Sequence, residues 1–256
     1  MWMYWLLFVL VGWSALTHMR PVHASGRGSS RTGSTLGQGW FWLLFLVVGF
    51  RHEVGADWFN YLEHVEIASQ QNFSEVVFGG DPAYNILNWF AAHFFGGLYL
   101  VNLICGGIFA WGLMVFCRSL PRPRLALLVA VPYLITVVAM GYSRQGVAIG
   151  LAMLGLVALL NGRIAVFILW IAFAALFHKS AVILLPLAMI ASSKNRFFAL
   201  IGILFSTAML FALLLQESME ILLYTYVEAE MESSGAGIRL AMNALPAVVF
   251  FLNPCS

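Results

Sequence analysis

Residues 125 to 161 read LALLVAVPYLITVVAMGYSRQGVAIGLAMLGLVALLN. The stretch is too long for one membrane span, which needs roughly 20 apolar residues. The polar segment Tyr142-Ser143-Arg144-Gln145-Gly146 interrupts it, so we expect two apolar helices joined at that segment. A pair of apolar helices with so short a polar connection is typical of a chain that crosses the bilayer repeatedly.

The composition of the whole chain supports a membrane location. Of 256 residues, 62% are apolar and only 9% are charged, with a mean hydropathy of +0.89. Soluble domains carry roughly 25% charged residues. A cytosolic enzyme, a secreted disulfide scaffold and a disordered tail are therefore excluded. We expect an all-α, polytopic membrane helical bundle, because helices satisfy their own backbone hydrogen bonds in lipid.

About nine spans are predicted in a single multispanning domain over residues 1–256. Two of them lie within residues 125–161. The others are expected at 1–17, 36–50, 98–117, 164–177, 180–191, 197–215 and 240–252. Three polar regions separate them: a flexible Gly/Ser/Arg loop at 18–39, an amphipathic segment at 51–97 and an acidic loop at 216–239. Asp81-Pro82 is expected to begin a helix inside the amphipathic segment.

The charge distribution predicts the orientation. With the loop at 18–39 in the cytoplasm, alternation of the spans places nine of the 13 basic residues inside and all 11 acidic residues outside. The amino terminus and the regions 51–97 and 216–239 are then extracytoplasmic. We expect the first span to be retained rather than cleaved as a signal peptide, because no Lys or Arg precedes its apolar run.

Four basic residues stand outside against the positive-inside rule: Arg51, Arg144, Lys179 and Arg239. Arg144 is the most informative, because an unpaired guanidinium between two apolar runs normally faces a partner or a wet cavity. It begins a helix with Gln145, and a helix amino end favours a phosphate or carboxylate. The alternative is an interfacial Arg that reaches the lipid headgroups.

The other three basic residues also lie in short polar motifs. Arg51 precedes two carboxylates, Glu53 and Asp57, which could position a base beside an anion site or could be a solvated helix flank. His178 and Lys179 lie between two apolar runs, where a lone His is usually a polar cap. Arg239 follows a Gly-rich stretch at the expected start of the last span.

Other catalytic motifs fit poorly. Gly141-Tyr-Ser143-Arg144 is similar to the Gly-x-Ser-Gly of intramembrane serine proteases, with His178 further along the chain, but Arg occupies the fourth position. No two His or Cys residues have metal-ligand spacing on a helix, so we expect no metal site.

Taken in order, the motifs resemble the EpsG-like branch of the Wzy-type polysaccharide polymerases. The resemblance spans about residues 40 to 250. The matching residues are Gly49-Phe-Arg51, Val54-Gly55-Ala-Asp57, Tyr61, Asp81-Pro-Ala-Tyr84, Leu87-Asn88, Gly141-Tyr-Ser-Arg144-Gln145, Ala148-Ile-Gly150, His178-Lys-Ser180-Ala181, Ser234-Gly235 and Arg239.

The resemblance implies a glycosyltransferase with a GT-C-like helical fold in the bacterial plasma (inner) membrane. Such an enzyme joins polyprenyl-pyrophosphate-linked oligosaccharide repeats into exopolysaccharide or O-antigen on the outer face, and needs no cofactor. Arg51, Arg144, Gln145, Lys179 and Arg239 would bind substrate. The base would be Asp57, Glu53 or His178.

The expected partners are the lipid-linked oligosaccharide, membrane lipids, and a flippase and chain-length regulator of the same pathway, but no nucleic acid. Family members usually continue through further spans, so we expect a member that is short at its carboxyl end, and inactive if the missing spans are essential. The main alternative function is a transporter or flippase of lipid-linked saccharides. It should show internal symmetry and a polar path that reaches the cytoplasmic side, and no internal repeat is evident in this sequence. A structural or assembly subunit is a second alternative.

Overall fold

The computed structural model describes residues 2–17, 32–55, 57–77, 80–94 and 96–188. All of them lie in the first of two units, Met1–Thr207 and Ala208–Ser256, into which the chain divides. Every regular element in the described residues is helical, and no strand occurs among them. The all-α prediction is confirmed for this part of the chain. The expected spans 197–215 and 240–252 and the acidic loop 216–239 lie outside it.

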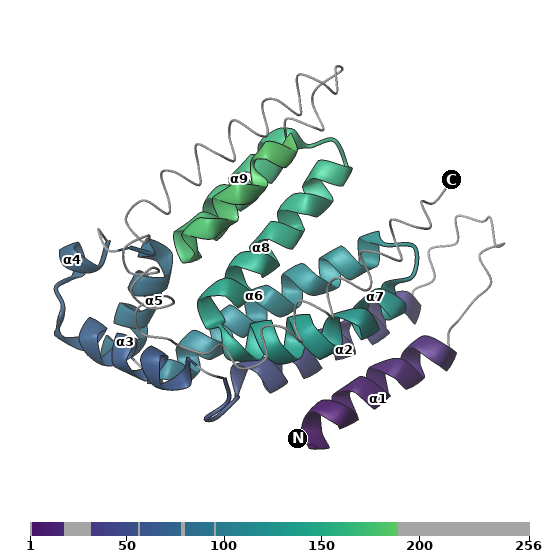
Figure 1. Ribbon diagram of the computed structural model, residues 1–256, viewed down its shortest axis with the longest axis horizontal. Helices are drawn as coiled ribbons and strands as arrows, with labels where there is room; N and C mark the ends of the chain where they lie inside the picture. The colour runs from purple at the N-terminus through teal and green to yellow at the C-terminus, as the bar shows by residue number, and fades with distance from the viewer. Residues whose placement is uncertain (1, 18–31, 56, 78–79, 95, 189–256) are drawn as a thin grey trace, which may run out of the picture. The chain divides into compact units, whose positions relative to one another are not determined.

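Two long apolar helices, α6 (Gly97–Ser119) and α8 (Ser143–Leu160), pack against each other. At 1.5 Å per residue they are about 34 and 27 Å long, close to the ~30 Å hydrocarbon thickness of a bilayer. Both have the length and composition of membrane-crossing helices. Helix α2 (Thr32–Gly49) packs on α6, and α9 (Ile164–Phe177) packs on α8 (Figure 1).

Glycines allow α6 and α8 to approach closely. Gly112 faces the carbonyl group of Gly150, and a Cβ atom on Gly150 would lie 2.6 Å from the Cα atom of Phe109. Any larger residue would push the helices apart. Small residues at the contact are the usual basis of helix packing in lipid, where no hydrophobic force drives the helices together.

The two helices predicted within 125–161 are both present. The first consists of α7 (Pro123–Ala130) and the π-helix η1 (Val131–Ala139), and the second is α8. Pro132 stands at the junction of α7 and η1, where its missing N–H and its ring are incompatible with a regular α-helical turn. The helix α1 (Trp2–Thr17) packs beside α7.

Two expected boundaries differ from the structure. Helix α2 begins at Thr32, inside the stretch 18–39 expected as a loop, because small polar residues are tolerated in the first helical turn, where several N–H groups lack partners anyway. The expected span 180–191 begins as a short 3₁₀ helix, η2 (Lys179–Leu184). Pro186 follows it, and a proline cannot donate the backbone hydrogen bond that an α-helix needs.

The amphipathic segment 51–97 forms three helices: α3 (Trp58–Gln70), α4 (Phe73–Val77) and α5 (Pro82–His93). Asp81 is the residue before α5 and Pro82 its first residue, as expected from the sequence. Helix α5 packs against α3, α4, α6 and α9, so this polar segment is attached to the amino end of α6 and the carboxyl end of α9.

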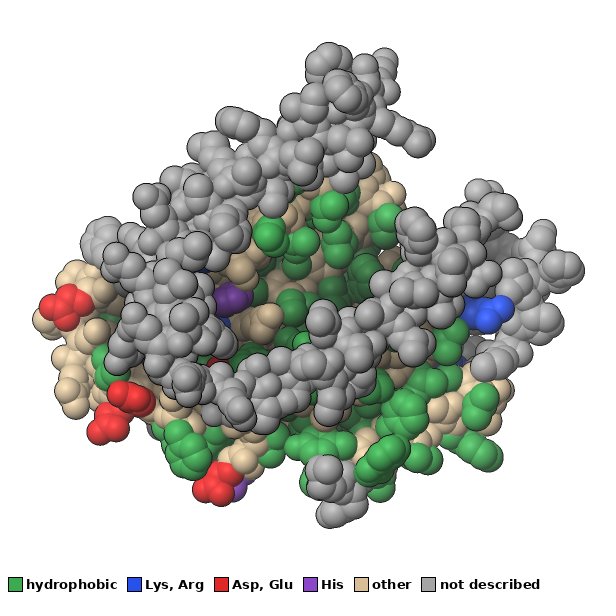
Figure 2. Space-filling view, in the orientation of Figure 1, with side chains coloured by type: hydrophobic (Ala, Val, Ile, Leu, Met, Phe, Trp, Pro, Cys, Tyr) green, Lys and Arg blue, Asp and Glu red, His purple; other side chains and the backbone are tan. Residues whose placement is uncertain are grey.

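The ends of the apolar helices alternate between two sides. Arg124 Nη1 donates to the Ser14 carbonyl at 3.2 Å, and the Arg118 side chain lies against Gly37. These contacts join one set of helix ends, whereas the helix ends around Arg51 meet on the other side. Figure 2 shows acidic side chains at the α3–α4 end and a basic side chain at the opposite end of the described part.

Candidate functional site

Arg51 is the most buried charged residue in the described part of the chain, with 4% of its surface exposed. It lies just after α2. Its Nη1 donates to the Ala139 carbonyl at 2.9 Å and its Nη2 donates to Asn102 Oδ1 at 3.0 Å and to Ser143 Oγ. Ser143 Oγ in turn donates to Asn102 Oδ1 at 2.8 Å. The guanidinium therefore joins the end of α2 to α6, η1 and α8.

The surroundings of Arg51 favour a structural role over contact with substrate. Its hydrogen-bond partners are neutral oxygens, and burial lowers the pKa of the guanidinium, although an Arg stays protonated in proteins. Its Nε and Asn102 Nδ2 have no hydrogen-bond partner in the described part of the chain. The cavity beside them holds only about 10 Å³, enough for roughly one water molecule.

The loop after Arg51 is pressed against the turn between η1 and α8. Gly55 has a φ of 102°, and a Cβ atom there would lie 2.7 Å from both Gly141 Cα and the Met140 carbonyl oxygen. Only glycine fits this close approach. Glu53 has a φ of 50°, which is uncommon for a residue with a side chain. This conformation fixes where the loop leads into α3.

Arg144, the second residue of α8, lies on the outer surface of this junction. Its Nη1 is 3.3 Å from Asp81 Oδ2, at the start of α5. Its Cζ lies 5.9 Å from the ring centre of Tyr61 and 5.7 Å from that of Tyr84. The Arg144 side chain is 35% exposed and that of Asp81 13%. The guanidinium group of Arg144 is thus held in place by Asp81 yet remains accessible to solvent.

Tyr61 and Tyr84 form the aromatic base on which Arg144 rests. Their ring centres are 5.9 Å apart, and each residue is 1% exposed. Burial raises the pKa of both phenols, so both stay neutral at physiological pH. The hydroxyl group of Tyr84 has no hydrogen-bond partner in the described residues. A guanidinium over two aromatic faces gains cation–π stabilisation.

Three more basic side chains surround the pair formed by Arg144 and Asp81. The Lys179 Nζ lies 4.0 Å from the position that a Cβ on Gly80 would occupy, next to Asp81. His178 and His64 are half-buried, and burial lowers the pKa of each. The charge of Arg144 lowers both values further, whereas Asp81 raises them. Both imidazoles are therefore mainly unprotonated at neutral pH.

The structure brings some of the candidate residues together and separates others. Arg144 on α8 and the neighbouring residues His178 and Lys179 at the start of η2 lie near Asp81. Asp57 interacts electrostatically with both Arg51 and His64. Gln145 is exposed on α8. Arg239 lies outside the described residues.

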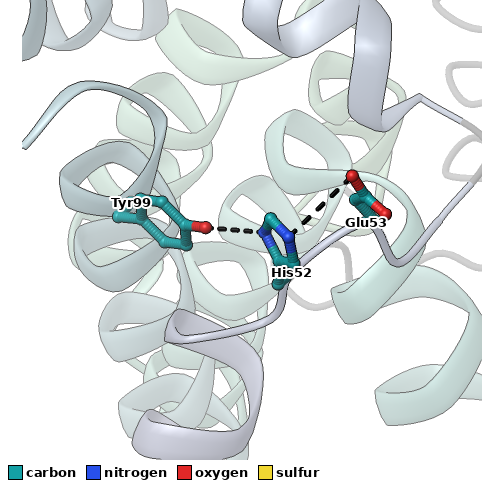
Figure 3. Close-up of polar contacts among 3 residues, drawn as sticks. All are labelled: His52, Glu53 and Tyr99. Atoms are coloured by element: carbon teal, nitrogen blue, oxygen red, sulfur yellow. Dashed lines mark hydrogen bonds and ion pairs between the residues drawn. The ribbon is translucent and has the colours of Figure 1, made fainter.

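Glu53 belongs to a second, exposed cluster rather than to the one around Arg144. Its Oε1 lies 3.9 Å from His52 Nε2, and both side chains are 65% exposed. His52 Nδ1 and Tyr99 Oη are 2.6 Å apart, and the two rings are stacked. Figure 3 shows the ring of His52 between Tyr99 and Glu53.

Sequence reasoning gave no site role to four residues that the structure places in these networks. Asp81, Tyr61 and Tyr84 matched the family pattern without an assigned function, and His64 was not singled out. A polar residue next to a helix start, such as Asp81, is too common to identify a site. The same holds for an aromatic residue three positions before a histidine, as in Tyr61 and His64. Only the packing of α3 and α5 on α8 brings them to Arg144.

The combination of groups around Arg144 suits an anion next to a polar organic molecule. Arg144 and Lys179 supply positive charge, and Arg binds phosphate oxygens in a bidentate geometry. Two half-buried, unprotonated imidazoles lie near them, and the buried aromatic rings support Arg144 from beneath. Among the residues that the structure describes, no group of three His, Cys, Asp or Glu side chains is placed to hold a metal ion.

Comparison with known proteins identifies one family. The model of the EpsG family matches residues 40–255, a range that contains every residue of both networks described above. Neither the curated proteins nor the solved structures contain a match to this chain.

Proposed function

Because this chain belongs to the EpsG family of polysaccharide-biosynthesis membrane proteins, we propose that it polymerises lipid-linked saccharide repeats. The donor is a saccharide on a polyprenyl pyrophosphate, and the acceptor is a hydroxyl group of a second lipid-linked saccharide. The reaction forms a glycosidic bond and releases the polyprenyl pyrophosphate. The cluster around Arg144 is the site at which this takes place.

One observation carries the proposal: Arg144 is fixed by Asp81 over two aromatic rings, and about a third of its side chain stays accessible. The Lys179 Nζ lies near Gly80, the residue before Asp81. When the pyrophosphate leaves the anomeric carbon, negative charge develops on the phosphate oxygen that was bonded to that carbon. A preorganised guanidinium and an ammonium group stabilise that charge in the transition state. Arg239 and Gln145 would extend the same site, and Asp57 or His178 would interact with the acceptor.

Arg51 has a different role in this proposal from the one that its charge alone suggests. Its donors are already used within the protein, and 4% of its surface is exposed. It would hold α8 in the position that presents Arg144. Substrate binding would fall to Arg144 and Lys179.

The membrane arrangement forms part of the proposal. The chain would cross the bacterial plasma membrane about nine times in a GT-C-like arrangement, with its amino terminus and the Arg144 cluster on the outer side. Alternation of the helix ends and the acidic side chains at the α3–α4 end support this orientation. Reporter fusions after Arg122 and after Glu228 should report opposite compartments, and the same compartment for both would contradict it.

The cellular test is deletion of the gene. A strain without the protein should accumulate the polyprenyl-linked single repeat on the outer face of the membrane, and Arg144→Ala should reproduce this at equal protein level. Arg163→Ala, an exposed Arg at the other side of the bundle, is the matched control and should give normal polymer. A single repeat that stays on the cytoplasmic face would instead indicate a flippase. Normal polymer from Arg144→Ala would contradict the proposal.

The same pathway would supply the protein partners. A flippase would deliver the lipid-linked repeat to the outer face, and a chain-length regulator would contact the polymerase there. Neither the flippase nor the chain-length regulator would take part in the glycosyl transfer at Arg144.

A further inference from the structure

Four histidines lie in the described part of the chain, and two of them have their ring nitrogens occupied. His52 shares a hydrogen bond with Tyr99, and His93 Nδ1 lies 2.9 Å from the Trp89 carbonyl oxygen, with its ring stacked on Trp89. His64 and His178 have no hydrogen-bond partner in the described residues. Both are also half-buried near Arg144.

His64 is packed against the aromatic base beneath Arg144. Its ring centre is 6.4 Å from that of Tyr61 and 6.5 Å from that of Tyr84, with the second pair perpendicular. The Cζ of Arg144 lies within 6 Å of the same two rings. Arg144 and His64 therefore pack against the same two buried rings, and the charge of Arg144 acts on the imidazole.

The charges around the two histidines distinguish them. For His178 the largest electrostatic influence is the carboxylate of Asp81, which raises its pKa, and Lys179 follows it in sequence. For His64 the largest is Arg144, which lowers its pKa. Both imidazoles are unprotonated at neutral pH, and His64 is the one of the two whose ring also packs against Tyr61 and Tyr84 beneath Arg144.

We propose that His64 is the proton acceptor for the attacking hydroxyl group, a role that rests on the proposed polymerase function. As the acceptor oxygen bonds to the anomeric carbon, its proton passes to a ring nitrogen of His64. The bond from the anomeric carbon to the pyrophosphate oxygen breaks, and its electron pair leaves with the pyrophosphate beside Arg144. The imidazolium then returns the proton to water, because His64 is only half-buried.

The acidic residues near His64 stabilise the imidazolium that this transfer forms. Glu63 and Asp57 on the α3 side and Asp81 before α5 all favour the protonated form and partly offset burial and Arg144. The imidazole can therefore hold a proton briefly without becoming permanently charged. A general base of this kind contributes about 10²- to 10⁴-fold to rate.

The test uses the full-length chain in membranes, with lipid-linked saccharide extracted from cells that lack it as substrate. His64→Ala should lower the rate of polymer formation about 100-fold or more, leave binding of the lipid-linked saccharide unchanged, and regain part of its rate when imidazole is added. His93→Ala should behave as wild type. If His64→Ala is poorly produced, His64→Gln keeps the side-chain size and should bind substrate without turning it over.

Several results would overturn the role of His64. These are a normal rate in either His64 variant, a loss of rate in His64→Ala that imidazole does not restore, and rescue by imidazole in His178→Ala only. Failure of the wild-type chain to form polymer from the same extract would contradict the polymerase function itself, and the role of His64 with it.

Discussion

Arg144 and Asp81 form an ion pair, with Arg144 Nη1 3.3 Å from Asp81 Oδ2, although 63 residues separate them in sequence. The pair joins the first turn of α8 to the residue before α5. It therefore links the apolar helices to the amphipathic segment that carries Tyr61, His64 and Tyr84. In this account Asp81 acts through Arg144 by fixing the direction of its guanidinium.

Asp81→Asn should separate activity from stability. The pair is partly exposed, so its loss should change the free energy of unfolding by less than about 1 kcal/mol. A guanidinium that is free to move should bind the lipid-linked saccharide more weakly and slow polymer formation by about 10-fold or more. Thermal unfolding in detergent and the rate of polymer formation measure the two effects.

Combining Asp81→Asn with Arg144→Lys in one chain tests whether Asp81 and Arg144 act together. If Asp81 acts through Arg144, Asp81→Asn should weaken substrate binding much less in the Arg144→Lys chain than in the wild type. Glu66→Gln, which changes an exposed carboxylate on α3, is the control and should alter neither rate nor stability. Additive losses in the double variant would mean that Asp81 acts independently.

Arg51→Lys should mainly reduce stability. A Lys ammonium cannot reach the Ala139 carbonyl, Asn102 and Ser143 at once, and each buried oxygen left without a donor costs about 1–3 kcal/mol. We expect the free energy of unfolding to fall by about 3 kcal/mol. Arg163→Lys, at an exposed position, should leave it unchanged. A fully stable Arg51→Lys that no longer binds substrate would place Arg51 in the binding site instead.

Gly150→Ala tests the contact between α6 and α8. The new methyl group would meet the Phe109 backbone at 2.6 Å, so the helices must separate, at a cost of about 1–3 kcal/mol. Gly39→Ala is the matched control, because the space around Gly39 is open for 4 Å, and it should be neutral or slightly stabilising. Equal unfolding temperatures for the two variants would show that close packing at Gly150 is unimportant.

The pH dependence of polymer formation should follow the protonation of His64. Since its pKa lies below the usual 6.5, activity should be complete at neutral pH and fall only in acid, as pH drops through that lowered value. The charged and titratable groups that face His64 are Asp57, Tyr61 and Glu63 on the α3 side, Asp81 and Tyr84 on the α5 side, and Arg144 on α8.

Glu63→Gln tests whether the pH dependence of polymer formation follows the pKa of His64. The Glu63 carboxylate raises the pKa of His64, so its removal should lower that pKa further and move the acidic fall in activity to lower pH. Glu66→Gln, an exposed change on the same helix, should leave the profile in place. A shift toward higher pH in Glu63→Gln would contradict the assignment of the titrating group to His64.

The sequence allowed the helical class and most element positions to be predicted, because apolar runs and their polar interruptions are strong signals in membrane proteins. Arg144 stood out for the same physical reason: a charge next to apolar sequence needs a partner. Its partner Asp81 could not be chosen among the 11 acidic residues, since the pairing depends on how α5 packs.

Arg51 shows the opposite limit of sequence reasoning. Charge and position made it resemble a substrate ligand, yet it lies among neutral oxygens from three other elements. One of these, Asn102, is a buried amide in an apolar helix, and such a polar residue was the available signal for an internal partner. The π-helix η1 positions the Ala139 carbonyl. Apart from Pro132, the local sequence gives no signal that predicts this π-helix.

In the proposed reaction, Arg144 stabilises a departing polyprenyl pyrophosphate as two saccharides are joined. The most direct measurement uses the purified full-length chain in lipid nanodiscs with lipid-linked saccharide from cells that lack it, and follows both products. We expect one polyprenyl pyrophosphate to be released per glycosidic bond formed, and both products to be lost in Arg144→Ala. Polymer formation by Arg144→Ala at the wild-type rate, or release of pyrophosphate lipid without any new glycosidic bond, would contradict it.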